Sequence, residues 1–266
     1  MAINALQSSA SALSALNTAL DVTANNLANV NTTGFKSSRA NFQDLLYIER
    51  AQPGVENANG DQRPIGLYVG LGVKVSGTQL NFAKGNPIVG DDLDMMIDGQ
   101  GFFKVKVEDS LGTTAYTRAG HFTRNSNGEM VLASSEGRRL DPDITIPSEA
   151  TGVQVSSDGK VWYTVSGDPA PQEAGQIQLV NFVNPAGLKQ IGETLFTATA
   201  ASGEPVEGTP GTDNRGTIKQ GYTESSNVDP TRELIDMIRT QRAFEMNSNT
   251  IRAADDTLRA VAQLRR

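Results

Sequence analysis

The sequence predicts an α+β fold: long N- and C-terminal helices form a coiled-coil-like pair, with an antiparallel β ribbon and a central all-β domain between them. Near both ends of the chain, apolar residues repeat every seven residues, which is typical of a narrow helix–helix seam. In the middle, polar and apolar residues alternate between turn signals, which is typical of half-buried strands. Stretches rich in Gly, Pro and Asn connect the two kinds of pattern.

The composition limits the classes of protein that need to be considered. The chain has 266 residues, 38% of them hydrophobic, which is enough for one modest core. It has no cysteine and one histidine, which excludes disulfide scaffolds and thiolate metal sites and disfavours histidine zinc sites and Ser-His-Asp triads. A net charge of −7 disfavours a nucleic-acid surface. No apolar run is long enough to predict a transmembrane helix.

The N-terminal pattern predicts a helix over residues 3–27, about 38 Å long. One seam position carries Ile3, Ala10, Asn17 and Ala24, and its partner position carries Leu6, Leu13, Leu20 and Leu27. We expect Asn17 to fix the register of the seam. The other faces are mostly Ser, Thr and Ala, and the only charge before Lys36 is Asp21. A solvated surface helix normally carries more charge, so we expect neighbouring molecules to cover these small polar faces. The alternative is an ordinary amphipathic helix on a domain surface.

The C-terminal pattern predicts a second helix that begins at Pro230, with Asp229 as its N-cap, and continues to Arg266. Its seam consists of Met237, Phe244, Ile251 and Leu258, with Thr240, Asn247, Ala254 and Val261 at the alternate position. Seven arginines nearly cancel six carboxylates from residue 229 onward, so the acidity of the chain resides between the helices. We expect the two seams to face one another, either parallel or antiparallel.

The region 96–222 is predicted to be an antiparallel β domain. Phe103, Val105 and Val107 alternate with charged residues, as in a half-buried strand. Turn signals at 125–128 and 157–159 predict two hairpins, which pair Tyr116–Arg124 with Glu129–Leu132 and Val153–Ser156 with Lys160–Val165. Further strands are expected at Ile177–Val183, Leu195–Ala198 and Ile218–Tyr222. The predicted domains are the N-terminal helix (1–33), an extended β region (34–95), the β domain (96–222) and the C-terminal helix (223–266).

No constellation of residues predicts catalysis, a cofactor or a metal. The glycines at 70–72 and 99–101 precede no helix and no Gly-Lys-Ser/Thr, so we interpret them as strand-edge glycines rather than phosphate loops. The aspartates of residues 91–98 lack the spacing of a calcium loop and predict a solvated turn. His121 and Trp162 are interpreted as structural residues.

Five blocks of sequence carry a resemblance to a known family. Residues 24–36 (ANNLANVNTTGFK) resemble the N-terminal signature of bacterial flagellar rod and hook proteins, and residues 241–248 (QRAFEMNS) resemble the C-terminal one. Residues 98–103, 116–120 and 221–228 resemble other blocks of the family, and all five occur in family order. The matched signature residues are Asn25, Asn26, Leu27, Asn29, Asn31, Gly34, Phe35, Lys36, Gln241, Arg242 and Asn247. We expect Gly34 to be a flexible or left-handed position between helix and ribbon.

Within the family, the chain length and the segment 47–66 resemble the distal rod. This segment contains Gln52-Pro53-Gly54 and resembles the stretch that marks the distal rod against the hook. It departs from that pattern in the Asn- and Gly-rich residues 56–61. A proximal rod or hook subunit of the same family is the alternative.

The resemblance implies a structural subunit, not an enzyme, that assembles helically into the shaft between motor and hook. The implied partners are copies of itself, the proximal rod and hook proteins, the P-ring and L-ring proteins and the flagellar export apparatus. The implied location is the periplasm-spanning rod, with no nucleic-acid partner and no membrane insertion. The N-terminus lacks the basic start and apolar stretch of a signal peptide, in agreement with type III export without a cleaved leader.

Two other classes of function were weighed against this one. A cell-wall glycan-binding module, with the helices as an oligomerisation stalk, is disfavoured because such a groove normally has several exposed aromatics and the chain has one Trp and five Tyr. A hydrolase with an Asp/Glu pair is disfavoured because no spacing recommends a pair.

Overall fold

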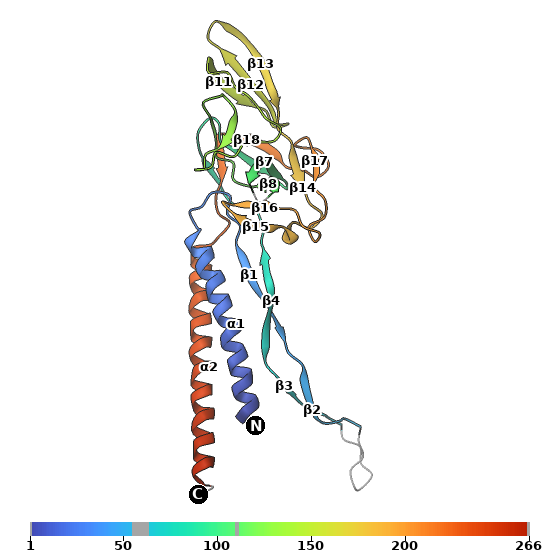
Figure 1. Cartoon of the computed structure of the whole chain (residues 1–266), viewed down its shortest axis with the longest axis vertical. Coiled ribbons are helices and arrows are strands. Elements are labelled where there is room, and N and C mark those ends of the chain that lie inside the picture. The colour runs from blue at the N-terminus through green and yellow to red at the C-terminus, as the bar shows by residue number, and fades with distance from the viewer. Residues whose placement is uncertain (1, 55–63, 110–111, 265–266) are drawn as a thin grey trace. The chain divides into compact units, whose positions relative to one another are not determined.

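The computed structural model describes residues 2–54, 64–109 and 112–264, and the chain divides into two compact units (Figure 1). Unit 1 comprises residues 1–28, 38–80 and 229–266, and unit 2 comprises residues 29–37 and 81–228. The chain therefore passes between the units four times. Terminal helices and many strands confirm the predicted α+β class.

The two helices of unit 1 begin where their sequence signals place them. Helix α1 spans Ala2–Ala28 and helix α2 spans Pro230–Leu264, with 27 and 35 residues. Asp229 Oδ1 accepts the N–H groups of Thr231 at 3.0 Å and Arg232 at 3.3 Å. This satisfies two of the free donors at the helix start and confirms the predicted N-cap. Among the described residues, no helix is both long and apolar enough to cross a membrane.

The helices of unit 1 lie side by side and antiparallel (Figure 1). Asn26, near the end of α1, donates a hydrogen bond to Glu233, near the start of α2, at 3.2 Å. Farther along, Asn17 and Leu20 of α1 line one groove with Phe244 of α2. The structure therefore decides between the two orientations that the sequence left open.

Unit 1 also contains an antiparallel ribbon. Strand β1 (Ser38–Asp44) pairs with β4 (Val73–Leu80), and β2 (Tyr47–Ala51) pairs with β3 (Leu67–Gly70). The N–H of Val73 donates to Ser11 Oγ at 3.2 Å, and a Cβ atom on Gly72 would overlap that hydroxyl. The chain's own ribbon thus covers part of the small-residue face of α1 that we expected neighbouring molecules to cover. It can do so because Ser8 and Ser11 are short enough to admit a glycine backbone.

Unit 2 is built from antiparallel strands. Its largest sheet has six strands in the order β15-β16-β8-β7-β14-β17, and a second sheet has three in the order β11-β12-β13. Three smaller pairs are β9–β10, β6–β18 and β5–β19. The bounds are β5 (Pro87–Val89), β6 (Met95–Asp98), β7 (Phe102–Asp109), β8 (Gly112–Thr117), β9 (Phe122–Arg124), β10 (Met130–Leu132), β11 (Ala150–Val155), β12 (Lys160–Val165), β13 (Asp168–Gln176), β14 (Leu179–Asn181), β15 (Lys189–Gly192), β16 (Leu195–Thr197), β17 (Val206–Gly208), β18 (Thr217–Gln220) and β19 (Tyr222–Glu224), with a 3₁₀ helix at Pro185–Gly187.

The buried apolar residues belong almost entirely to unit 2. Its core includes Met95, Phe103, Leu140, Ile144 and Ile177, all essentially inaccessible to solvent. Each such side chain contributes roughly 1.5–3 kcal/mol on burial. In unit 1, Ala15 is the only buried hydrophobic residue among the side chains that the structure describes. Unit 2 therefore has a core of its own, and unit 1 does not.

The observed strands correct several sequence-based expectations. The predicted strand Ile218–Tyr222 is divided between β18 and β19, and β15 and β17 are not among the predicted strands. Tyr116–Arg124 was predicted as one strand, but β8 ends at Thr117 and β9 begins at Phe122. Between these two strands the backbone of Gly120 pairs with Met95 instead: its carbonyl accepts the N–H of Met95 at 2.8 Å, and a Cβ atom on Gly120 would overlap the Met95 carbonyl. Strand β13 is not among the strands expected from the sequence; it contains prolines but lies at the edge of its sheet, where a missing N–H is tolerated. The hairpins β9–β10 and β11–β12 confirm both predicted turns.

Gly34 adopts φ +71°, which confirms the predicted left-handed position. A Cβ atom there would lie 2.5 Å from the backbone nitrogen of Ala119. We expect Gly34→Val to destabilise unit 2 by about 2–5 kcal/mol, because backbone strain and steric overlap add. Urea unfolding followed by the fluorescence of Trp162, which lies in unit 2, measures this change.

Gly137→Val is the matched control. Gly137 has φ +57° but no atom within 4 Å of a Cβ, so this variant carries the strain without the overlap. Equal unfolding midpoints for the two variants would show that the close approach at Gly34 contributes nothing.

Candidate assembly surface and buried ion-pair network

The predicted seam residues lie along the helix pair with different degrees of exposure. Those that are half-buried are Leu6, Leu13, Leu20, Leu27, Met237, Phe244 and Ile251. Asn17 is exposed, and Leu258 keeps 38% of its surface. The side chains of Ile3 and Val261 lie outside the described part of the structure. Leu20 and Phe244 border a groove of about 210 Å³ between the helices.

Helix α2 carries apolar side chains that α1 leaves uncovered. Leu234, Ile235, Ile238 and Met246 are between 46% and 64% exposed. The ion pairs on the same helix, Arg239–Asp236 and Arg259–Asp255, are also exposed, and such pairs add little stability. The helix pair thus has an apolar surface that the described residues leave uncovered, and exposed apolar surfaces of this kind are typical of interaction sites.

The ribbon of unit 1 carries a second set of exposed apolar residues around β2 and β3. Its members are Leu46, Tyr47, Ile48, Ile65, Leu67 and Tyr68, and Leu46 keeps 82% of its surface. The predicted rod-specific insert spans residues 47–66, of which residues 55–63 lie outside the described residues.

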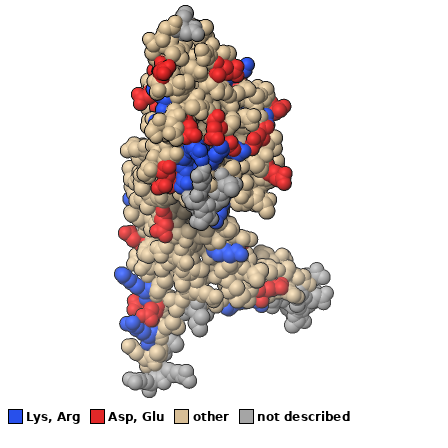
Figure 2. Space-filling model, turned by 45° about the horizontal axis from the view of Figure 1, so that its top comes forward, with Lys and Arg blue, Asp and Glu red and all other residues tan. Residues whose placement is uncertain are grey.

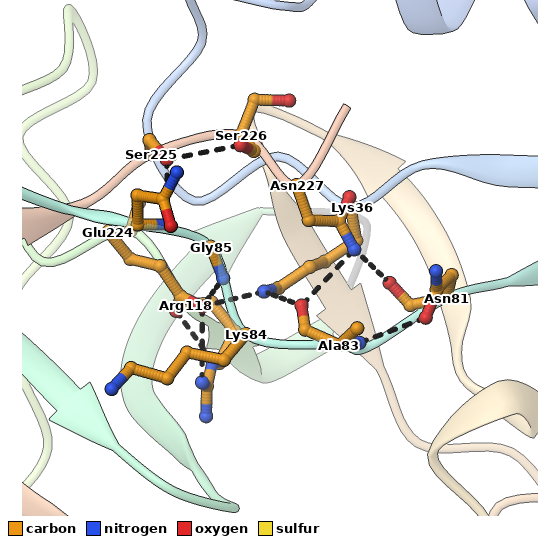
Figure 3. A network of polar contacts seen from close by, with 12 residues as sticks. Lys36, Asn81, Ala83, Lys84, Gly85, Arg118, Glu224, Ser225, Ser226 and Asn227 are labelled. Atoms are coloured by element: carbon orange, nitrogen blue, oxygen red, sulfur yellow. Dashed lines mark hydrogen bonds and ion pairs between the residues drawn. The ribbon is translucent and has the colours of Figure 1, made fainter. Parts of the chain in front are cut away.

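A buried ion-pair network lies in unit 2 (Figure 3). Glu224, at the end of β19, accepts hydrogen bonds from Lys36 Nζ at 2.8 Å, from Arg118 Nε at 2.9 Å and from the N–H of Gly85 at 2.8 Å. The side chains of Lys36 and Glu224 are fully buried, and that of Arg118 is 4% exposed. Three segments far apart in the sequence therefore meet at one carboxylate.

The network holds two cations and one anion. Backbone carbonyl oxygens accept hydrogen bonds from the cations and so stabilise the excess positive charge. Arg118 Nη1 donates to the carbonyl oxygens of Gly99 at 2.9 Å and Gly101 at 2.6 Å, and Lys36 Nζ donates to that of Ala83 at 2.9 Å. Buried charges need such compensation because leaving one unpaired costs several kcal/mol.

The network shifts the pKa values of its members. Burial opposes the charged form of Glu224, but the guanidinium of Arg118 and the ammonium of Lys36 outweigh it and hold the pKa of Glu224 below its ordinary value of 4.5. Burial, together with the nearby Arg118, lowers the pKa of Lys36, and Glu224 opposes this shift.

Two signature asparagines bind backbone groups. Asn26 is buried in unit 1, where its side chain donates to the carbonyl of Ser38 at 2.8 Å and accepts from the N–H of the same residue at 3.0 Å. Asn227 of the fifth block accepts from the N–H of Ser37 at 2.8 Å and donates to the carbonyl of Asn81 at 2.7 Å in unit 2. Asn26 thus binds the backbone at the start of β1, and Asn227 binds backbone groups that lie outside strands, which gives them hydrogen-bond partners.

The signature residues other than Asn26, Gly34 and Lys36 are exposed or half-buried. Asn25, Asn31, Gln241 and Arg242 are exposed, while Leu27, Asn29, Phe35 and Asn247 are half-buried. Asn29 Oδ1 accepts from the Thr32 hydroxyl at 3.1 Å, and Asn247 donates to the carbonyl of Ala243, one turn earlier in α2, at 2.9 Å.

Arg118 and Glu224 were missed as site residues, although both lie inside the blocks quoted for the resemblance. The signal that could have found them is a charged residue embedded in a Gly-, Ser- and Thr-rich stretch between strand patterns. Lys36 was selected as a signature residue, but its partners could not be read from the sequence.

The aspartate cluster at residues 91–98 serves local structure. Asp94 is buried, accepts the N–H of Asp91 at 2.8 Å and contacts His121 Nδ1 at 2.6 Å, so the prediction of a solvated turn is wrong for this residue. Asp98 pairs with Lys84 and Lys219, whose hydrogen bonds lower its pKa to about 2. The described residues contain no group of three or more His, Cys, Asp or Glu arranged to hold a metal.

On the face drawn in Figure 2, acidic and basic side chains lie close to one another, and most of the surface is neither.

Three family models match successive parts of the chain. They are described as "Flagella basal body rod protein" (residues 6–36), "Flagellar hook protein FlgE/F/G D1 domain" (residues 96–163) and "Flagellar basal body rod FlgEFG protein C-terminal" (residues 219–264). The flagellar basal-body rod protein FlgG of Caulobacter vibrioides is 44% identical over 99% of this chain and 100% of that protein.

The chain belongs to the flagellar basal-body rod protein family. The FlgG protein of Borreliella burgdorferi is 40% identical over 99% of both chains. The FlgF rod protein of C. vibrioides is 34% identical over 91% of this chain and 89% of that protein. The predicted family is confirmed, and the stronger similarity to FlgG than to FlgF in the same organism supports the distal rod over the alternative within the family.

Each family model contributes one member of the buried network. Lys36 lies in the rod model, Arg118 in the D1 model and Glu224 in the C-terminal model. The ion-pair network therefore connects the three matched regions of this rod protein.

We expect Glu224→Gln to destabilise unit 2 by roughly 3–5 kcal/mol, because it leaves two buried cations without a counter-charge. The matched control is Glu207→Gln, which removes an ion pair to Lys104 at a carboxylate that is 40% exposed, and it should cost less than about 1 kcal/mol. Urea unfolding monitored at Trp162 measures both.

The same variant should change the acid dependence of stability. Since the pKa of Glu224 is depressed in the folded state, its charge stabilises the fold above pH 4.5 and that stability is lost as the pH falls through the depressed value. Glu224→Gln should therefore be less acid-sensitive than the parent. If Glu224→Gln and the parent lose stability equally as the pH falls, the proposed role of the Glu224 charge is wrong.

Proposed function

We propose that this chain is a structural subunit of the distal rod, which assembles helically into the shaft that transmits torque from motor to hook. Family membership supports the assignment to the basal-body rod. The observation that carries the proposed assembly is the apolar surface of α2, which the described residues leave uncovered.

The energetics of unit 1 favour completion by other copies. Fixing the backbone costs roughly 1–2 kcal/mol of conformational entropy per residue. Helix α1 has 27 residues and helix α2 has 35. Half-buried leucines and one buried alanine offset little of this cost. Packing the exposed faces of α1 and α2 against neighbouring subunits supplies the missing burial.

Long helices packed side by side also suit a torque shaft. Bending such an array strains many backbone hydrogen bonds and close-packed contacts at once. We assign the heptad residues from Leu6 to Leu27 and from Met237 to Leu258, with Ile3 and Val261, to a coiled-coil-like seam that forms the inner tube. The β domain then lies outside this tube and meets the surrounding parts of the organelle.

The proposed partners are copies of this chain, the proximal rod and hook proteins, and the P-ring and L-ring proteins. We further propose delivery by the flagellar export apparatus without a cleaved leader. Helices that are incompletely packed before assembly suit passage through a narrow channel, because little structure must be undone.

In the free monomer we expect the amides of residues 3–27 to exchange with solvent within seconds, whereas amides around Phe103 and Val105 in the core of unit 2 stay protected. Hydrogen exchange read by mass spectrometry, on monomer and on assembled filaments, tests this. Protection of residues 3–27 in a verified monomer would contradict the proposal that assembly orders the helices.

We expect Leu20→Asp to block assembly, because it places a carboxylate beside Phe244 in the seam. A cost of about 3 kcal/mol per subunit raises the concentration needed for assembly by roughly a hundredfold. Electron microscopy of filaments and complementation of motility measure the effect. Leu20→Met keeps the size and polarity of the side chain and should assemble normally.

Unit 2 of the Leu20→Asp protein should unfold at the parental urea concentration, as reported by Trp162. Normal assembly of this variant would refute the seam assignment, and loss of unit 2 stability would point to misfolding instead.

A further inference from the structure

A groove opens on the face of the three-stranded sheet that points away from the core of unit 2. Val161 is buried in the core, so its neighbour Trp162 projects from the opposite face. There Trp162 and Thr164 of β12, Gln154 of β11 and Pro171 of β13 line a groove together with Asp92 and Gln220. Its volume of about 410 Å³ lies in the range of small-molecule sites, roughly 300–1,000 Å³.

Hydrogen bonds hold the wall of this groove in place. Gln220 Nε2 donates to the carbonyl oxygens of Asp92 at 2.6 Å and Val153 at 2.8 Å, and its Oε1 accepts the N–H of Val155 at 2.7 Å. The absence of a side chain at Gly152 leaves room beside the Thr164 hydroxyl, since a Cβ atom would lie 3.1 Å from it. The groove is therefore pre-formed, which lowers the entropic cost of binding.

Polar groups without strong internal partners face this groove. Gln154 and Asp92 are exposed, and their side chains make no hydrogen bond within the described part of the chain. The Thr164 hydroxyl makes one long bond, of 3.5 Å, to the carbonyl of Gly152. No lysine or arginine is among the described lining residues, so an anionic ligand would meet the Asp92 carboxylate without compensation.

A flat indole beside an amide, a carboxylate and a hydroxyl is complementary to a pyranose ring. Such a ring has a face of C–H groups that can stack on an aromatic surface and a rim of hydroxyls that donate and accept hydrogen bonds. We propose that this groove binds a neutral pyranose unit of a glycan chain, stacked on Trp162 and hydrogen-bonded by Gln154, Asp92 and Thr164.

One aromatic platform gives weak binding for a single copy. Repetition of the site along an assembled rod would raise the avidity for a long polysaccharide; this last step rests on the proposed function, whereas the site itself does not. The small number of aromatic residues, which disfavours glycan binding as the main function, is thus compatible with an accessory site in which Trp162 is the one aromatic among the described lining residues.

The test titrates the full-length chain with N,N′,N″-triacetylchitotriose and, separately, with cellotriose. Trp162 is the only tryptophan, so its fluorescence reports this groove alone. We expect a saturable shift with a Kd on the order of millimolar, with saturation transfer to the sugar C–H protons in ligand-observed NMR.

Substitutions of lining residues test whether the sugar binds in this groove. Gln154→Ala should weaken it by roughly fivefold through loss of a hydrogen bond, and Trp162→Leu should abolish saturation transfer. The matched control is Gln178→Ala, an exposed glutamine outside the groove, which should bind as the parent does. Circular dichroism of each variant verifies the fold.

Three results would overturn the proposal. The first is no saturable response to either sugar at concentrations far above the millimolar range. The second is equal affinity of Gln154→Ala and Gln178→Ala. The third is a response to a proline-rich peptide but to neither sugar, which would assign the groove to a protein partner. Filament formation, measured independently by electron microscopy, separates these failures from a failure of the proposed function.

Discussion

The carboxylate of Glu224 is the constraint on which the organisation of unit 2 depends. It is fully buried between Lys36 and Arg118, and each charge is tolerable there only because the others are present. The chain passes between the two units four times, and the network residues Lys36, Ala83 and Glu224 each lie close in sequence to one of these passages. The network thus fixes the backbone around Lys36 and Ala83, which lies outside strands, against the end of β19.

The two units differ in how much apolar surface they bury. Unit 2 buries a continuous apolar core beneath antiparallel sheets, whereas unit 1 displays much of its apolar surface. We propose that unit 2 has the same fold in the monomer and in the filament, and that unit 1 gains its remaining packing only in the assembled state.

Small residues decide how closely the elements of unit 1 can approach. Ser8 and Ser11 admit the backbone of Gly72 against α1, and the amide of Asn26 imitates a peptide group toward Ser38. The low charge of α1 therefore has two causes: part of its surface faces the chain's own ribbon, and we propose that part faces neighbouring subunits. Signature residues such as Asn26 and Gly34 thus act through backbone geometry rather than through chemistry at a reactive site.

Features that depend on a few neighbouring residues could be predicted from local sequence signals. The cap at Asp229, the turns that join β9 to β10 and β11 to β12, and the left-handed Gly34 each depend on a few adjacent residues. The heptads predicted two helices because their period is a local property. Tertiary structure alone decided the antiparallel orientation, the pairing of β1 with β4 and the edge position of β13. It also brought together Lys36 and Glu224, which are 188 residues apart, since no local pattern records which distant charges will share one buried site.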